Sequence, residues 1–164
     1  MGGGQPSEGL LGGGARLLEP SLPQERLTIG LYALAMAEQA FEDTLAYARQ
    51  RQAFGQPVGT FQHNRFTLAE MATELAVARE FTDRAIMEHC ADRLSTAEAS
   101  MVKWWNTELC NRVTDRCVQL HGGYGYMREY PVGRAWADSR VQSIFGGTTE
   151  IQKEIIGRGL GLSP

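Results

Sequence analysis

The chain has 164 residues, of which 43% are hydrophobic and 21% charged, and its formal net charge is -3. A chain of this length can bury roughly 70% of the surface that its unfolded form exposes, so we expect one domain with a real core. The mild negative charge and the lack of a basic stripe argue against a nucleic-acid partner. No apolar run approaches the ~18 residues of a membrane span, and the first residues do not resemble a signal peptide. We therefore expect a cytoplasmic protein.

Residues 1–21 contain two glycine triplets and little periodicity, which predicts a flexible leader or the remnant of a preceding domain. A long helix then begins near Pro23, because proline suits the first turn of a helix. Apolar residues continue at helical spacing from Leu27 to Ala48, over about seven turns. We therefore place the start of the folded domain, 22–164, at this helix.

Turn residues at 55–59 separate this helix from a second long one, which runs from about Phe66 towards Arg93. A third helix opens at Ser95, because Glu98 three residues later completes a capping box. Its expected buried stripe consists of Met101, Trp105, Leu109, Val113, Cys117 and Leu120.

Three glycines within 122–125 end the third helix. A shorter helix is expected over about 131–141, and a last one over about 149–159, capped by Thr148 or Thr149. The two short helices together are long enough to form a fourth member, and short connections make neighbours antiparallel. The sequence therefore predicts an all-α protein, an antiparallel up-down four-helix bundle.

The cysteines and histidines do not form a recognisable site. The three cysteines are odd in number, lack CxxC spacing and are expected to be reduced core thiols: Cys90, Cys110 and Cys117. The three histidines are too scattered for a metal cluster and are expected on helix surfaces or in the core: His63, His89 and His121. We predict no metal site.

The glycines at 122–125 suggest a ligand only weakly. A Rossmann dinucleotide fingerprint follows a strand, whereas these glycines follow a helix, so that motif is excluded. A plain helix end needs one glycine, so a simple turn and the close approach of a ligand are equally open.

Three further positions have both a structural and a functional interpretation. Gly146 and Gly147 precede a helix N-terminus, which favours an anion such as a phosphate but is more often a capped start. Arg51, at the end of the first helix, complements the helix dipole or binds phosphate. Glu25 is a first-turn acid or a general base.

Five motifs occur in order along the chain: LPQERL at 22–27, RQAFG at 51–55, QLHGGYG at 119–125, EYP at 129–131 and GGTTEIQ at 146–152. Together they resemble the C-terminal domain of the acyl-CoA dehydrogenases, most of all the long-chain and isovaleryl types. The resemblance implies a four-helix bundle that assembles into a homotetramer, a dimer of dimers. It also implies FAD as cofactor, lying across the interface of two subunits.

The resemblance places the cofactor on specific residues. Arg51 resembles the family arginine that contacts the FAD pyrophosphate. Phe54 is then expected beside the flavin dinucleotide, and Gln62 near the adenine.

Two more groups of residues match cofactor positions of the family. Gln119, Gly122 and Gly123 match the stretch that the dinucleotide of a neighbouring subunit crosses. Thr148 and Glu150 match positions that contact FAD at the head of the last helix. The resemblance therefore implies that both glycine breaks face the cofactor.

Gly146 departs from many family members, which carry their catalytic glutamate at that position. The long-chain and isovaleryl types instead use a glutamate at the head of the first helix, and Glu25 matches it. The implied reaction is the α,β-dehydrogenation of an acyl-CoA thioester to trans-2-enoyl-CoA, with Glu25 as general base. Arg26 and Gly147 are expected to contact substrate.

Family members also contain an N-terminal helical domain and a middle β domain, so we expect a truncated or separately encoded C-terminal domain. Its electrons are expected to pass to electron-transferring flavoprotein. Two alternatives stay open: an acyl-CoA oxidase, which passes electrons to oxygen, and a non-catalytic helical oligomerisation or binding module.

Overall fold

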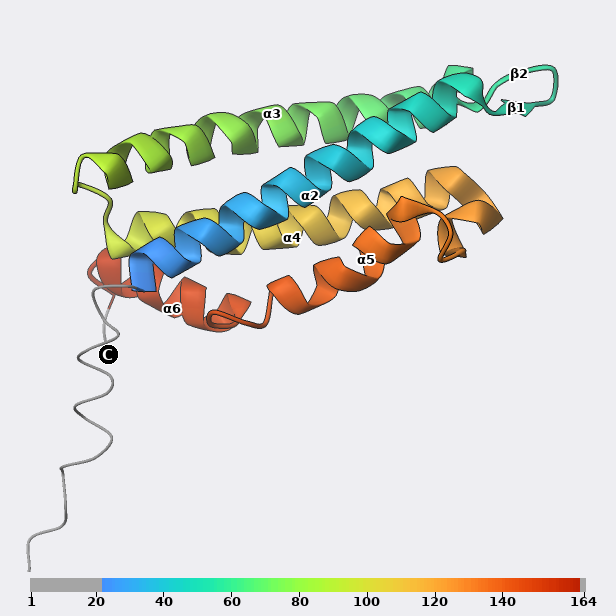
Figure 1. The fold of residues 1–164 in the computed structure, drawn as a ribbon. Helices are drawn as coiled ribbons and strands as arrows, with labels where there is room; N and C mark the ends of the chain where they lie inside the picture. Colours follow the sequence, from blue (N-terminus) through green and yellow to red (C-terminus); the bar gives the residue numbers. More distant parts are fainter. Residues whose placement is uncertain (1–21, 163–164) are drawn as a thin grey trace, which may run out of the picture.

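The structure is a computed structural model that describes residues 22–162, so the expected leader at 1–21 lies outside it. Its helices are α2 (Leu22–Gln50), α3 (Gln62–Cys90), α4 (Thr96–His121), α5 (Pro131–Gln142) and α6 (Thr149–Gly159). The first three lie side by side in alternating directions, and α5 and α6 follow one another along α4 (Figure 1). The expected all-α bundle, with a fourth member made of two short helices, is confirmed.

The connection between α2 and α3 contains a hairpin that we did not expect. β1 (Gln52–Ala53) pairs antiparallel with β2 (Gln56–Pro57), and the short 3-10 helix η1 (Val58–Thr60) follows. Gly55 turns the chain with a φ of 80°, a value that glycine tolerates. The hairpin projects from one end of the bundle (Figure 1). Strands of two residues are too short to give an alternating pattern in the sequence.

Helix α4 begins where the sequence predicted. The hydroxyl of Ser95 accepts a hydrogen bond from the backbone N–H of Glu98 at 3.1 Å, and the Glu98 carboxylate accepts one from the Ser95 N–H at 3.3 Å. The Glu98 carboxylate also accepts a hydrogen bond from the Ser95 hydroxyl at 2.8 Å, and this bond, together with the one from the Ser95 N–H, lowers the pKa of Glu98. The expected capping box is therefore confirmed.

Helix α4 contacts the four other helices, and this position explains which of its residues are buried. Its buried polar side chains are Ser100, Lys103, Asn106, Thr107, Thr114 and His121. One member of the stripe expected for this helix is wrong, because Trp105 is 39% exposed. A helix enclosed on several sides buries polar as well as apolar positions, so a stripe read from hydrophobicity alone is shifted.

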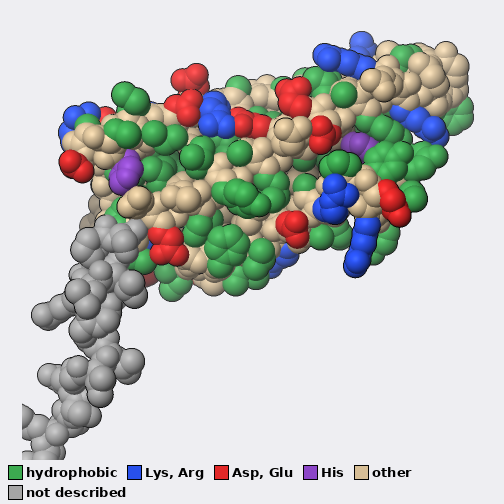
Figure 2. All heavy atoms as spheres, in the orientation of Figure 1, with side chains coloured by type: hydrophobic (Ala, Val, Ile, Leu, Met, Phe, Trp, Pro, Cys, Tyr) green, Lys and Arg blue, Asp and Glu red, His purple; other side chains and the backbone are tan. Residues whose placement is uncertain are grey.

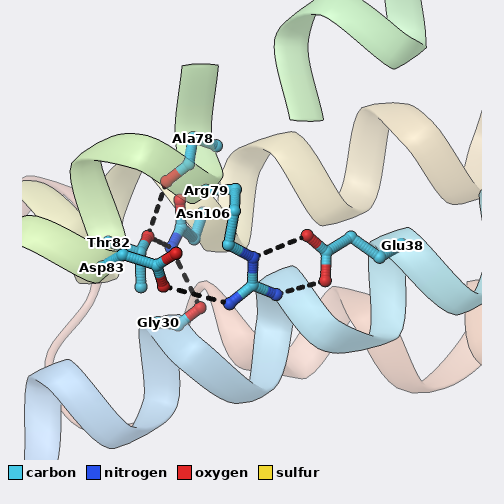
Figure 3. Close-up of polar contacts among 7 residues, drawn as sticks. All are labelled: Gly30, Glu38, Ala78, Arg79, Thr82, Asp83 and Asn106. Atoms are coloured by element: carbon cyan, nitrogen blue, oxygen red, sulfur yellow. Dashed lines mark hydrogen bonds and ion pairs between the residues drawn. The ribbon is translucent and has the colours of Figure 1, made fainter. Parts of the chain in front are cut away.

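A polar layer crosses the middle of the bundle (Figure 3). The Asn106 amide donates to the Gly30 carbonyl at 3.1 Å and to the Thr82 hydroxyl at 2.8 Å. At its side, Arg79 of α3 pairs with Glu38 of α2. The amide hydrogen bonds therefore join α2, α3 and α4 at one level.

Among residues 22–162, no helix combines the length and hydropathy needed to cross a membrane. Hydrophobic side chains do gather over the lower part of the surface in Figure 2, where α5 lies in Figure 1. Exposed apolar residues on and after α5 are Trp136, Val141, Ile144 and Phe145. A patch of this kind is typical of a surface that packs against another molecule.

Candidate functional site

The residues singled out in the sequence fall at opposite ends of the bundle. Glu25 lies in the first turn of α2, whereas Arg51 directly follows its last residue. A helix of 29 residues is ~43 Å long. The structure therefore does not bring the two groups into one site within a single chain.

At the hairpin end, an open cavity of about 970 Å³ lies between the end of α2, the start of α3 and the end of α4. Its lining includes Arg51, Gln119, Gly122 and Gly123, four of the predicted cofactor residues. The Arg51 guanidinium lies over the ring of Tyr124, 5.5 Å from its centroid. The four residues predicted from separate motifs are thus brought together.

Two other predicted residues lie at this end but do not line the cavity. Phe54 is 97% exposed near the hairpin tip, and its ring meets that of Phe61 edge-on at 6.2 Å. Gln62 is exposed at the start of α3, and the next two residues, His63 and Asn64, line the cavity instead. Sequence reasoning missed these two, because nothing local marks them as facing α4.

The fold does not need the three glycines at 122, 123 and 125 for the same reason. Gly122 caps α4 with a φ of 60°, which is the expected helix-end role. A Cβ atom on Gly125 would lie 2.4 Å from the carbonyl oxygen of Val118, so packing requires that glycine. Gly123 has no positive φ, and a Cβ built there would meet nothing within 4 Å. Nothing within the described chain requires a glycine at 123.

Buried aromatic packing supports the floor of this cavity. His121 is buried, stacks on Tyr47 with ring centroids 4.2 Å apart, and its Nδ1 lies 2.9 Å from the Cys117 carbonyl. His121 is therefore one of the core histidines that the sequence predicted. The described residues contain no group of three or more His, Cys, Asp or Glu placed to hold a metal ion.

At the other end, Glu25 lies beneath the second glycine break. A Cβ atom built on Gly146 would lie 3.9 Å from Oε1 of Glu25 and 2.2 Å from Cδ1 of Ile29. The Glu25 side chain is exposed, so its carboxylate reaches this surface without being buried by it. The structure thus places the Glu25 carboxylate next to residue 146, where this chain has a glycine and no carboxylate.

Arg26 follows Glu25 on α2 and, unlike it, is buried. Its side chain is only 8% exposed, and its Nε has no hydrogen-bond partner among the described residues. Burial lowers the pKa of Arg26, and the nearby Glu25 carboxylate opposes that shift. A positive charge therefore lies behind the Glu25 site.

The loop over Glu25 is held from the inside. Gly146 and Gly147 have φ values of 64° and 93°. The Gln152 amide donates to both of their carbonyls, at 3.1 and 3.0 Å, and Lys103 Nζ donates to the Gly147 carbonyl at 2.6 Å. The sequence analysis missed both donors. The burial of Lys103 could have been predicted, because Lys103 shares one helical face with the buried Ala99 and Asn106.

Thr148 and Glu150 line a separate cavity of about 360 Å³ beside this loop. Thr149, which follows Thr148, donates a hydrogen bond from its hydroxyl to Glu108 at 2.6 Å. Glu150 is exposed, and hydrogen bonds from its own backbone N–H and from Thr148 lower its pKa. These two predicted residues therefore belong to the Glu25 end.

The cysteines do not take part in either group. Burial raises the pKa of Cys110 to about 12 and that of Cys117 to about 11, as expected of core thiols. Cys90 is exposed, so the core prediction is wrong there. It is the last residue of α3 and lies off the buried face defined by Ala78 and Ala85.

Residues 12–161 match the family described as acyl-CoA dehydrogenase, C-terminal domain. The mitochondrial long-chain specific acyl-CoA dehydrogenase of Rattus norvegicus is 49% identical over 156 residues, covering 93% of this chain and 36% of that protein. A caffeyl-CoA reductase-Etf complex subunit of Acetobacterium woodii is 37% identical over 131 residues, covering 80% and 35%. The crystal structure of an acyl-CoA dehydrogenase from Geobacillus kaustophilus superposes with a TM-score of 0.86 at 49% identity, covering 87% and 38%. The chain thus spans little more than a third of the length of these relatives.

Proposed function

This chain belongs to the acyl-CoA dehydrogenase family, and from that premise we propose that it is the helical C-terminal domain of an FAD-dependent acyl-CoA dehydrogenase. The reaction is the α,β-dehydrogenation of an acyl-CoA thioester to trans-2-enoyl-CoA. The observation that carries this proposal is the position of Glu25, whose Oε1 lies 3.9 Å from a Cβ built on Gly146. A carboxylate from the first helix thus lies within contact distance of position 146, while Cδ1 of Ile29 fills the space directly beside Gly146.

The hairpin end fits one part of the cofactor. Its cavity is open, contains the Arg51 guanidinium, and has free space above Gly123 where a side chain would otherwise project. A guanidinium binds phosphate groups through paired hydrogen bonds, and a bare glycine lets a ligand approach the backbone. Arg51 would therefore hold the pyrophosphate, and Gln119, Gly122 and Gly123 would lie against the dinucleotide.

The predicted cofactor residues lie at both ends of the bundle, so they can contact the same FAD only if two copies of the chain contribute to its site. Phe54 and Gln62 would contact the dinucleotide at the hairpin end, whereas Thr148 and Glu150 would contact it from the far end of a neighbouring subunit. The separation of the two ends and the apolar surface on α5 support an assembly in which copies pack together. We propose the homotetramer, a dimer of dimers, as that assembly.

Glu25 acts on the substrate as a general base. Its carboxylate takes the proton from Cα of the acyl group, and the electrons of that C–H bond form the new double bond as a hydride leaves Cβ. When bound, FAD supplies the hydride acceptor. Arg26 and Gly147 would line the substrate side, next to Glu25.

The proposed electron acceptor is electron-transferring flavoprotein. The Acetobacterium woodii relative is named as a subunit of a complex with Etf, which supports this partner. That relative is named a reductase, so the direction of the reaction is part of the proposal. The cytoplasmic location and the 22–164 domain boundary also stay predictions.

The test is flavin binding and reduction by the purified chain. We expect a yellow protein with about one FAD per subunit, whose flavin absorbance is bleached by acyl-CoA under anaerobic conditions. Electron-transferring flavoprotein should restore the absorbance in the absence of oxygen. Rapid recovery with oxygen alone would support an acyl-CoA oxidase instead. A colourless tetramer would support a non-catalytic module and contradict the proposal.

A further inference from the structure

The buried ammonium group of Lys103 is an unusual feature of this bundle. The side chain is 0% exposed in the middle of α4, and its Nζ donates to the Gly147 carbonyl at 2.6 Å. The chain contains one other lysine, Lys153, which is exposed on α6. Burying an ammonium group is costly unless it is well paired. The fold therefore buries an ammonium group beside this loop, although its burial is energetically unfavourable.

Packing alone does not explain Lys103. The Gly147 carbonyl already accepts a hydrogen bond from the Gln152 amide at 3.0 Å, so it would not be left without a donor. Burial lowers the pKa of Lys103 and the nearby Arg26 adds to this shift, whereas Glu108 opposes it. Hydrogen bonds from charged donors are roughly twice as strong as neutral ones, so Lys103 adds strength that Gln152 alone does not provide.

Gln152 donates hydrogen bonds to the loop although its own side-chain oxygen is left without a hydrogen-bond partner among the described residues. Its Nε2 reaches both the Gly146 and Gly147 carbonyls, while its buried Oε1 has no partner among the described residues. A Cβ atom on Gly147 would lie 2.6 Å from that Nε2 and displace it, and the φ of 93° favours glycine at this position. The two side chains and the two glycines therefore form one unit.

This unit faces Glu25. The same loop that the donors hold on the inside carries Gly146, whose missing side chain would lie 3.9 Å from the Glu25 carboxylate. Glycine has more backbone freedom than any other residue, so two successive glycines hold one conformation only where surrounding contacts fix them. A shift of about 1 Å in groups near a reacting centre is enough to reduce turnover strongly.

We propose that Lys103 and Gln152 are positioning residues for the reaction: their side chains clamp the Gly146 and Gly147 carbonyls and so hold the loop in place beside Glu25. The statement about the reaction rests on the function proposed for Glu25. The clamp itself is a property of the folded chain and does not require flavin or substrate.

The clamp is tested by amide hydrogen exchange on the full chain, followed by NMR. The Thr149 N–H donates to the Ser143 carbonyl at 3.2 Å, and the Gln152 N–H donates to the Thr148 carbonyl at 3.0 Å, so both amides report on loop opening. In Lys103→Met we expect both to exchange about tenfold faster, because a charge-assisted hydrogen bond is lost. The matched control is Lys153→Met, which removes the same charge from the surface and should leave both rates unchanged.

The melting temperature separates positioning from general support of the fold. Replacing a buried charge by an apolar side chain of similar volume is often neutral or stabilising, so Lys103→Met should melt no lower than the wild type. Unchanged exchange at Thr149 and Gln152 would overturn the proposal. Faster exchange throughout α2 and α4 with a lower melting temperature would overturn it as well.

Turnover adds a second measurement. In protein that binds FAD and is reduced by acyl-CoA, Lys103→Met should lower kcat at least tenfold with KM nearly unchanged, because Lys103 does not touch substrate. Normal kcat would overturn the positioning role even if the loop exchanges faster. A wild-type chain that binds no flavin, but whose loop responds to Lys103→Met, would contradict the proposed function and leave the clamp intact.

Discussion

The two ends of the bundle are built in opposite ways. At the hairpin end, Phe54 and Arg51 are exposed, and Gly123 faces open space. At the other end, the buried Lys103 and Gln152 hold the loop above Glu25 with hydrogen bonds. One end is therefore an open surface formed by exposed side chains, and the other is a loop held in place by buried side chains.

This difference agrees with the division of roles between subunits that we propose. Proton transfer depends on sub-ångström placement, so the residues around Glu25 need support from a rigid interior. Binding of an extended dinucleotide depends on the length and charge of side chains, so the residues that bind it can be exposed in the single chain. The predictions below test that division, starting with the largest expected effect.

The change Glu25→Gln should lower kcat by about 10²–10⁴-fold, because it removes the base and keeps its shape. The melting temperature should not change, since the side chain is exposed. Stopped-flow measurement of flavin reduction by acyl-CoA checks the rate. Glu42→Gln, on an exposed position of the same helix, is the control and should reduce flavin normally. Equal rates for the two variants would remove Glu25 from the mechanism.

Two glycines of one motif should respond differently to alanine. Gly125→Ala should destabilise the fold by about 1–3 kcal/mol, because the new Cβ would lie 2.4 Å from the Val118 carbonyl oxygen. Gly123→Ala should change stability by less than about 0.5 kcal/mol, because its Cβ meets nothing. Its effect should appear in FAD affinity instead. Chemical denaturation and flavin titration measure the two quantities. Unchanged FAD affinity in Gly123→Ala would mean that no ligand approaches there.

Arg51→Gln should weaken FAD binding by about ten- to a hundredfold, through loss of a charged hydrogen-bond donor to phosphate. Stability should hardly change, since Arg51 is exposed. Arg49→Gln removes the same charge two residues earlier, from a side chain outside the cavity lining. Fluorescence titration with FAD compares the two variants, and equal losses would point to net charge rather than to a contact.

Ser95→Ala should cost about 1 kcal/mol at neutral pH through loss of the N-cap of α4. The folded-state pKa of Glu98 lies below its usual value, so its contribution is present above that usual value and is lost as the pH falls through the folded-state pKa. The difference between wild type and variant should therefore shrink in acid. Denaturation at pH 7 and at pH 3 measures it. Loop exchange at Thr149 should stay unchanged, because the clamp does not depend on the cap.

Local sequence signals were sufficient for the helices but not for the interior of the site. Pro23, the Ser95 capping box and Pro131 mark helix starts through short-range chemistry, and the structure begins helices within one residue of each. The placement of Glu25 under Gly146 followed from a resemblance between motifs, not from spacing. Lys103 was missed because a lysine on a helix is usually solvated, and only the packing of α6 against α4 buries this one.

The amide layer of Asn106 has a consequence for the Glu25 site. A buried side chain that bonds to Gly30 on one side and Thr82 on the other allows one longitudinal alignment of three helices. Sliding α2 by one turn, ~5.4 Å, would leave the amide unmatched and carry the carboxylate of Glu25 away from Gly146. The alignment that this polar layer fixes at Gly30 therefore also sets the position of Glu25, about one and a half helical turns away on the same helix, where we propose that the proton is removed.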